Sequence, residues 1–340
     1  RLIAGTSGIA ATVLLLGAVI VAAGLTVFAL WWATGIWSKV SLPPAARFGL
    51  AAAALLAVVP ASTGKVWGGN LPYAKSRLDL ARHTAEDLRE LRQAAAQDPF
   101  ADQQGLLSAI DRDVLIIFVE SYGRTSFDTP FYADMHLPTL QAAEADLTQA
   151  GLAMRSGFLA APTQGGQSWL SHATFANGLR VGDQTRYQAT LASGRQSLFH
   201  HAQRSGFRTA AVMPAITRPW PEAATMGFDR VLAADDLGYQ GLPFNWVTMP
   251  DQFTLTATDR LLRSGGQDQP HLFAQIALIS SHAPWVPVPE LVDWDDVGDG
   301  RVFDRMAVEG DPPEVVWRDR DRVRDHYRAS VDYSLRTVLE

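Results

Sequence analysis

The sequence contains no cysteine, which excludes disulfide bonds, thiolate metal ligands and cysteine nucleophiles, although it leaves the redox compartment open. It also lacks an excess of positive charge, because 35 acidic side chains outnumber 29 basic ones. Proteins that bind a nucleic-acid backbone present a basic surface, so this balance argues against nucleic acid as a partner. Internal repeats and low-complexity tracts are absent as well. Most of the chain is therefore ordinary mixed globular sequence.

Charged side chains are nearly absent from the first 66 residues, and none occurs between Leu2 and Trp37. This run is longer than the ~20 apolar residues that span a bilayer. Trp31 and Trp32 lie near one end of it with Trp37, like an interfacial belt. The pattern predicts a transmembrane helix. A cleaved signal peptide is the alternative, but its apolar region is shorter, about 7–15 residues, and no clear charged region precedes this run.

A second uncharged run covers residues 48–64, at the short end of what can cross a bilayer. It predicts a second span, with a buried or re-entrant hydrophobic helix as the alternative. Lys39 and Arg47 lie between the runs, and the positive-inside rule places that loop in the cytoplasm. We therefore expect residues 1–66 to form a membrane region of about two transmembrane helices in the cytoplasmic (inner) membrane. The protein is then multi-pass, has the lipid bilayer as a partner and is extracytoplasmic after Lys65.

The rest of the chain alternates the signals of helices and strands. Between Ala74 and Gln97 apolar residues recur at helical spacing among dense charges, which predicts a spacer helix within residues 67–110. Residues 111–340 alternate apolar strand patterns with helical ones, as in an α/β/α sandwich with a largely parallel sheet. The expected strands are residues 114–120, 152–159, 207–213 and 271–279, and the expected helices are residues 139–149, 169–177, 196–204, 251–263 and 322–340.

The first candidate for a metal ligand is Glu120, at the end of the strand that begins at Val114. The run from Val114 to Val119 does not alternate with polar residues, which is typical of a parallel strand buried on both faces. In open α/β sheets ligands bind beyond the carboxyl ends of the strands, so Glu120 and Ser121 are expected at the rim of a site. The alternative is an ordinary strand end with a solvated glutamate.

The second candidate is Ser168, which lies where a glycine-rich turn meets the start of a helical pattern. Gly165 and Gly166 allow the backbone to approach a ligand closely, and amides at a helix N-terminus favour a bound anion. A serine hydroxyl at this position can act as a nucleophile when a metal ion lowers the cost of its alkoxide. The alternative is that Ser168 is only the N-cap of the helix.

Polar residues also follow two further expected strands. His282 can contact a phosphate oxygen or bind a metal, and a structural histidine bonded to the backbone is the alternative. Arg218, close to Trp220, suits a phosphate group. Several polar groups placed after separate strands are harder to attribute to chance than any one of them.

Three segments carry a resemblance to a known family: the strand Val114–Glu120 with its following Ser-Tyr-Gly, the turn Gly165–Trp169, and the segment Ser280–Trp285. They resemble the alkaline phosphatase superfamily, and within it the membrane-anchored lipoteichoic acid synthase-like phosphoglycerol transferases, often labelled sulfatase-like. The resemblance covers residues 113–340 and fits an architecture of two spans, a spacer helix and an extracytoplasmic catalytic domain.

The resemblance implies roles for particular residues. Glu120 and Ser168 would ligate a divalent cation, with the Ser168 hydroxyl as the nucleophile. His282 would contact the transferred group. Arg218 and Trp220 would hold the headgroup, although the sequence match is loose at these two positions.

The resemblance also implies a metal-dependent transferase of phosphoglycerol or phosphoethanolamine type, or a phosphodiesterase. Its donor would be a membrane phospholipid headgroup, and its acceptor a glycan or lipid. Oxygen-rich ligation with at most one histidine suits manganese best, with magnesium or zinc as alternatives.

One departure from the family concerns its metal site, which is completed by an Asp-His pair at the end of a later strand. The only Asp-His dipeptide here is Asp325-His326, inside the charged, helix-like run Arg318–Arg328, so we reject it as the ligand pair. The chain is therefore expected to stop inside the catalytic domain and to be inactive by itself.

Three other functions remain open. A sulfuric ester hydrolase of the formylglycine kind needs proline two places and arginine four places after its Cys or Ser, but Leu170 and His172 occupy those positions after Ser168. A serine hydrolase with a nucleophile elbow needs Gly-x-Ser-x-Gly, and the last glycine is absent. A catalytically silent membrane protein that binds glycans or lipid headgroups is the third alternative.

The acidic cluster Asp293–Asp299 lacks the ligand order of a calcium-binding EF-hand loop.

Overall fold

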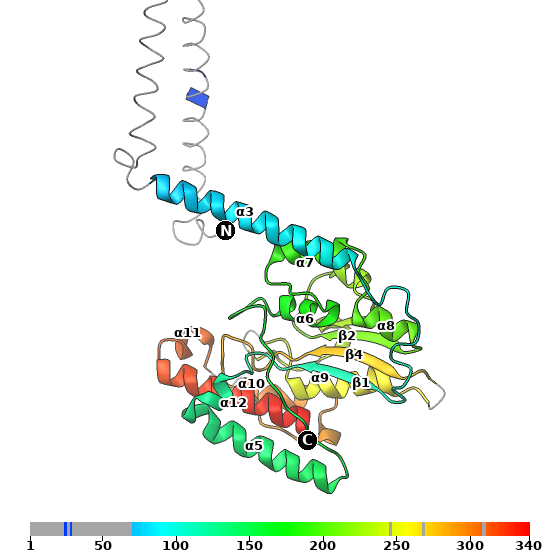
Figure 1. The fold of residues 1–340 in the computed structure, drawn as a ribbon. Helices are drawn as coiled ribbons and strands as arrows, with labels where there is room; N and C mark the ends of the chain where they lie inside the picture. Colours follow the sequence, from blue (N-terminus) through cyan, green and yellow to red (C-terminus); the bar gives the residue numbers. More distant parts are fainter. Residues whose placement is uncertain (1–23, 26–27, 29–69, 245–246, 267–268, 308–310) are drawn as a thin grey trace, which may run out of the picture. The chain divides into compact units, whose positions relative to one another are not determined.

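The computed structural model describes residues 24–25, 28, 70–244, 247–266, 269–307 and 311–340 (Figure 1). The two predicted membrane spans, residues 2–37 and 48–64, lie almost wholly outside these ranges. Among the residues that are described, no helix is long and apolar enough to cross a bilayer. The membrane region and its topology therefore stay predictions.

The chain divides into two compact units, residues 1–83 and residues 84–340. Helix α3, Asn70–Ala96, matches the predicted helix and passes from one unit into the other. In the second unit its last turns bury Leu91 and Ala95 beside Leu179, in a small apolar cluster. This end of α3 is thus packed onto the second unit, while its role as a spacer stays a prediction.

The second unit contains a four-stranded, fully parallel sheet with the order β1-β4-β2-β3. Three of the strands were predicted, because each is short and mostly apolar. In the register Phe118 pairs with Ala277 and Val212 with Ile276, so the carboxyl ends of the strands meet at one edge. The strands are β1 (Val114–Phe118), β2 (Arg208–Met213), β3 (Arg230–Ala233) and β4 (Leu272–Ala277).

Helices cover both faces of this sheet, with α6, α7 and α8 on one side and α9, α12 and α5 on the other (Figure 1). The alternation along β4 shows why: Leu272 and Ile276 belong to a core shared with α9, whereas Phe273 packs with Phe199 of α8. The predicted α/β/α sandwich with a parallel sheet is confirmed. The longer helices are α5 (Pro130–Gln149), α6 (Ser168–Asn177), α7 (Gln184–Ala192), α8 (Leu198–Arg204), α9 (Asp251–Thr258) and α12 (Arg320–Leu339).

Shorter elements complete the second unit. They connect the strands to the helical layers and cover the ends of the sheet. They are the helices α4 (Thr125–Asp128), α10 (Asp304–Ala307) and α11 (Pro313–Val316), the 3₁₀ turns η1 (Pro221–Thr225), η2 (Ala234–Leu237), η4 (Trp294–Asp296) and η5 (Arg301–Phe303), and the π-helical turn η3 (Asp259–Arg263).

The strand predicted at residues 152–159 is wrong. The segment is irregular and pairs with no strand among the described residues. Leu152 is 59% exposed and Leu159 is 95% exposed, so its apolar side chains reach no core. The turn before Ser168 therefore does not follow a sheet strand, as the predicted strand at residues 152–159 would have required.

Helix α5 begins at Pro130, well before the predicted start near Thr139. Proline is tolerated at the first helical position because the N–H it lacks would have no partner there. Pro138 lies inside the helix, where it had been interpreted as part of a loop. Strand β3 and helix α7 were not predicted, because each is short and mixes polar with apolar residues.

Candidate active site

Glu120 lies in the turn that follows β1, two residues beyond the end of the strand. The turn is held through its backbone: the Ser281 hydroxyl donates to the Glu120 carbonyl at 2.7 Å, and the Tyr327 hydroxyl donates to the Ser121 carbonyl at 2.9 Å. The Glu120 side chain is half-buried, and its carboxylate has no hydrogen-bond or ion-pair partner within the described residues. A partly buried carboxylate without a partner is available to a ligand or a cation.

Ser168 is the first residue of α6, and Gln167 before it occupies the N-cap position. The interpretation of Ser168 as the N-cap is therefore wrong. Gly165 and Gly166 precede Gln167 with φ of 70° and 71°, so the turn into the helix is left-handed over three residues. In the part of the chain that is described, no hydrogen bond engages the Ser168 hydroxyl, which leaves it free to react or to bind.

Two non-glycine residues have positive φ among those the structure describes: Ser121 at 58° and Gln167 at 57°. Each is adjacent in sequence to one of the two predicted metal ligands, Glu120 and Ser168. A side chain in this conformation costs roughly 1–2 kcal/mol, and such strain is concentrated at functional sites. The two turns are thus held in costly conformations at the positions where chemistry is predicted.

Glu120 and Ser168 line one cleft of about 910 Å³ at the carboxyl edge of the sheet. The structure therefore places both predicted residues in the lining of one cleft. Their roles as metal ligands and nucleophile stay predictions. The cleft is also lined by residues from α4, α5, the 159–166 segment and α12, among them Arg124, Tyr132, Leu159, Gly165, Trp285, Arg324 and Tyr327.

His172 lines the same cleft and was missed in the sequence analysis as a site residue. The sequence spacing could have identified His172, because it follows Ser168 by four residues and residues four apart lie on one face of a helix. The imidazole is 6% exposed, and its ring centroid lies 3.9 Å from that of Phe118. Burial lowers the pKa of His172 to about 4, so the ring is neutral at physiological pH.

This burial predicts a pH dependence of stability. The unfolded chain binds a proton at His172 below its ordinary pKa of 6.5, whereas the folded protein does so only near pH 4. The free energy of unfolding should therefore fall as the pH drops from 6.5 to 4, by up to about 3 kcal/mol from this residue. Thermal unfolding of the intact protein across this range should show the loss. The variant His172→Gln should lack this contribution, and an equal slope in both proteins would contradict the assignment.

Two arginines at the cleft were also missed. Arg124 forms an ion pair with Asp128 at 3.0 Å and lies 4.3 Å above the ring of Phe158. Arg324 comes from α12, and its guanidinium lies 4.5 Å above the ring of Phe131. Both contribute positive charge to the cleft, which favours an anionic ligand.

His282, Arg218 and Trp220 do not line this cleft. His282 follows β4, and its Nδ1 lies at hydrogen-bond distance from the carbonyl oxygen of Ala283. Arg218 and Trp220 follow β2, and the Trp220 ring centroid is 6.1 Å from that of Phe228. The substrate-binding roles of these three residues stay predictions.

A divalent cation suits the type of ligand in the cleft, because the Glu120 carboxylate and the Ser168 hydroxyl are oxygen donors that have no partner within the described part of the chain. Among the described residues, however, no three His, Asp or Glu side chains are grouped so that they could hold a metal. Asp325 and His326 lie in the middle of helix α12, and Asp325 pairs with Arg328 at 3.3 Å. Glu120 and Ser168 are therefore the two residues that would hold the ion.

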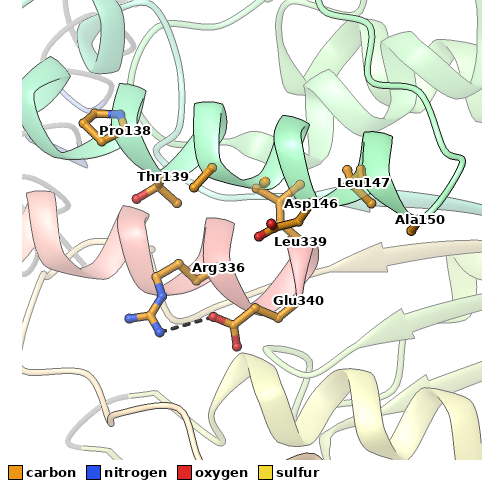
Figure 2. A pocket seen from close by; sticks show the side chains of 10 residues that line it. Pro138, Thr139, Asp146, Leu147, Ala150, Arg336, Leu339 and Glu340 are labelled. Carbon is orange, nitrogen blue, oxygen red and sulfur yellow. Dashed lines mark hydrogen bonds and ion pairs between the residues drawn. The ribbon is translucent and has the colours of Figure 1, made fainter.

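A second hollow of about 660 Å³ lies between α5 and α12 (Figure 2). Small side chains such as Ala142 and Ala143 line it, and Arg336 and Glu340 form an ion pair of 3.2 Å at its rim. None of the predicted site residues lines it. The cleft at Glu120 is therefore the candidate active site.

Parallel strands that end in a carboxylate, next to a helix start that presents a hydroxyl, define an α/β protein with a candidate site at the carboxyl edge of its sheet. The sequence profile of the Sulfatase family matches residues 112–339, well over half of the chain, and the chain belongs to this family. The predicted resemblance to sulfatase-like proteins is thereby confirmed. No curated protein sequence matches the chain significantly.

Two solved structures are similar to the chain. One is the lipoteichoic acid synthase LtaP from Listeria monocytogenes, with 15% identity over 75% of this chain and 56% of that one, and a TM-score of 0.48. The other is a protein in the alkaline phosphatase superfamily from Vibrio parahaemolyticus, with 14% identity over 75% of this chain and 57% of that one, and a TM-score of 0.32. The chain thus spans little more than half the length of either.

Proposed function

We propose that the protein is a membrane-anchored, metal-dependent phosphoryl-group transferase or phosphodiesterase of the Sulfatase family. The observation that carries this proposal is the pairing of Glu120 and Ser168 in one cleft. Neither side chain has a hydrogen-bond or ion-pair partner among the described residues, and each is next to a residue held in a left-handed conformation. A binding surface without chemistry has no need of a free hydroxyl at a strained helix start.

In this mechanism the Ser168 oxygen attacks phosphorus, the bond from phosphorus to the lipid alcohol breaks, and the lipid alcohol leaves with the proton that Ser168 gives up. A hydroxyl group of the acceptor, or water, then attacks the phosphorus of the seryl ester, the bond from phosphorus to the Ser168 oxygen breaks, and the proton of the attacking group returns to Ser168. A divalent cation bound by Glu120 and Ser168 would supply charge for the developing alkoxide and for the phosphoryl oxygens. The Gly165–Gln167 turn fixes the position of the serine relative to the substrate.

The charge of the cleft fits an anionic substrate. Arg124 and Arg324 line it from segments that are distant in sequence, and both can donate to phosphoryl oxygens. His282, Arg218 and Trp220 remain the proposed contacts to the transferred headgroup. The neutral His172 ring packs against Phe118 in the lining of the cleft and adds no positive charge there at physiological pH.

The proposed donor is a membrane phospholipid with a phosphoglycerol or phosphoethanolamine headgroup, and the proposed acceptor is a glycan or another lipid. Manganese is the proposed cation, with magnesium and zinc as alternatives. The proposed location is the cytoplasmic (inner) membrane, with the catalytic unit on its outer side. These assignments rest on the sequence of residues 1–66 and on the family resemblance.

A sulfuric ester hydrolase is the second candidate, because the matching family is named for that activity. The sequence around Ser168 argues against it. Sulfatases that use formylglycine need a proline and an arginine where Leu170 and His172 stand. Phosphoryl transfer by an unmodified serine is therefore the favoured chemistry.

Turnover by the full-length protein in phospholipid vesicles tests the proposal. Three probes separate the reactions: a fluorescent phosphatidylglycerol, bis(p-nitrophenyl) phosphate and p-nitrophenyl sulfate. We expect both phosphodiesters to react, the sulfate to react at least about tenfold more slowly, and a chelator to stop turnover until manganese is restored. Faster cleavage of the sulfate would favour the second candidate, and turnover that survives the chelator would contradict the metal.

A further inference from the structure

Asp251 is a fully buried carboxylate at the start of α9, remote in sequence from every predicted site residue. One carboxylate oxygen accepts the backbone N–H groups of Ile279 at 2.8 Å and Ser280 at 2.9 Å. The other accepts the hydroxyl of Ser334, on α12, at 2.6 Å. The carboxylate thus joins the segment after β4 to α12.

Burying a carboxylate is costly unless hydrogen bonds compensate for the lost water. Burial raises the pKa of Asp251 because the charged carboxylate has lost its contact with water. An apolar side chain would fill the same space without this desolvation cost. The position is therefore better explained by what the carboxylate orders than by packing alone.

The first segment that Asp251 orders leads directly to the Glu120 turn. Ile279 and Ser280 immediately precede Ser281, whose hydroxyl donates to the Glu120 carbonyl at 2.7 Å. Ser281 is fully buried, and its own carbonyl accepts the Trp285 indole N–H at 2.9 Å. A shift of the two amides that Asp251 holds would therefore move the donor that fixes Glu120.

The second segment leads to the same turn by a separate route. Ser334 lies on α12 two turns after Tyr327, on the same face of the helix. The Tyr327 hydroxyl donates to the carbonyl of Ser121 at 2.9 Å. Both hydroxyl groups that hold the strained Glu120–Ser121 turn thus stand on segments that the Asp251 carboxylate ties together.

We propose that Asp251 is a positioning residue for the Glu120 carboxylate, acting through Ser281 on one side and Tyr327 on the other. The inference rests on the proposed function, in which Glu120 holds a divalent cation. A left-handed residue persists only where its surroundings over-determine it, and the two hydroxyl donors supply that constraint at Ser121. Without the carboxylate the turn relaxes and the ligand oxygen leaves its place.

The test measures manganese affinity of the full-length protein from the loss of the spectroscopic signal of free Mn²⁺. Asp251→Ala removes both acceptors, and Ser334→Ala removes only the link to α12. Gln252→Ala is the matched control, because Gln252 is equally buried on the same helix and bonds to Val292 (2.7 and 3.1 Å), which does not line the cleft. We expect the first two variants to weaken manganese binding by about tenfold, and the control by less than about twofold.

Rescue separates positioning from general stability. Asp251→Asn keeps the oxygen that accepts the two amides and can donate to the Ser334 hydroxyl, so its manganese affinity should be close to that of the unaltered protein. Equal losses of affinity in Asp251→Ala and Gln252→Ala, at equal losses of unfolding temperature, would overturn the proposal. If Asp251→Ala does not fold, the Ser334→Ala variant decides the question alone.

The failure of this inference is distinguishable from the failure of the proposed function. If Glu120→Gln binds manganese as tightly as the unaltered protein, the proposed metal site is wrong and the inference falls with it. If Glu120→Gln loses manganese while Asp251→Ala and Ser334→Ala retain it, the metal site stands and only the positioning role is overturned.

Discussion

The variant Ser168→Ala should lose turnover of a phospholipid headgroup ester by about 10³-fold or more, because it removes the proposed nucleophile. The fold should be preserved, since the Ser168 hydroxyl makes no hydrogen bond to the described residues and alanine is a better helix former than serine. The measurement is steady-state turnover by the full-length protein with manganese present, alongside its unfolding temperature. A loss of activity without a loss of stability is the expected result.

Two further variants make this result specific. Ser171→Ala changes a serine of the same helix that also lines the cleft, but whose hydroxyl lies 3.3 Å from that of Thr163. It should change turnover only severalfold. Ser168→Thr keeps a hydroxyl at the helix start and should retain measurable turnover. Near-normal activity of Ser168→Ala would show that another group attacks the ester, and the nucleophile would have to be sought elsewhere in the cleft.

The two central residues of the cleft were predictable because local sequence determines both of them. An unbroken apolar run ending in a carboxylate indicated Glu120, since such strands are usually parallel and end at the ligand-binding edge, although β1 proves to be an edge strand that is only partly buried, with Leu115 40% exposed. A double glycine before a helical pattern indicated Ser168, since glycines allow a ligand to approach the backbone closely at a helix start. Neither inference needed a contact between distant parts of the chain.

The remaining lining of the cleft could not be predicted, because it depends on such distant contacts. Arg324 belongs to a helix whose sequence is densely charged, which is typical of an exposed helix. It lines the cleft only because α12 packs beside the Glu120 turn. Asp251 is one acidic residue among many in the sequence, and its burial becomes visible only in the fold. At residues 152–159 the sequence predicted too much. Their apolar composition indicated a strand, but this segment pairs with no strand among the described residues.

Two turns at the cleft are held in strained backbone conformations, and several surrounding elements are needed to stabilise them. Ser121 and Gln167 hold conformations that the isolated chain would avoid, so each turn must be fixed by its neighbours. Two buried hydroxyl donors fix the first turn, and the backbone of α6 fixes the second. The cleft is therefore preorganised by residues that touch no substrate, and variants at those residues should affect binding before they affect folding.

The variant Glu120→Gln should lose manganese and turnover together while keeping, or slightly gaining, stability. Its carboxylate is half-buried without a protein partner within the described residues, so removing the charge relieves a desolvation cost. Residues that only orient a metal ligand change affinity by about 10–100-fold, so loss of the ligand itself should weaken manganese binding by about 100-fold or more. Glu144→Gln is the control, because Glu144 is exposed on α5 away from the cleft.

Thermal unfolding with and without manganese is the most discriminating test of the role of Glu120 as a metal ligand. A ligand that binds only the folded protein raises the unfolding temperature by an amount that grows with the logarithm of the ratio of its concentration to its Kd. Manganese should therefore stabilise the unaltered protein and Glu144→Gln, and should have little effect on Glu120→Gln. Because Ser168 is a neutral donor, Ser168→Ala should retain part of that stabilisation. If manganese stabilises Glu120→Gln as much as the unaltered protein, the ion binds elsewhere, and the carboxylate at the end of β1 is not its ligand.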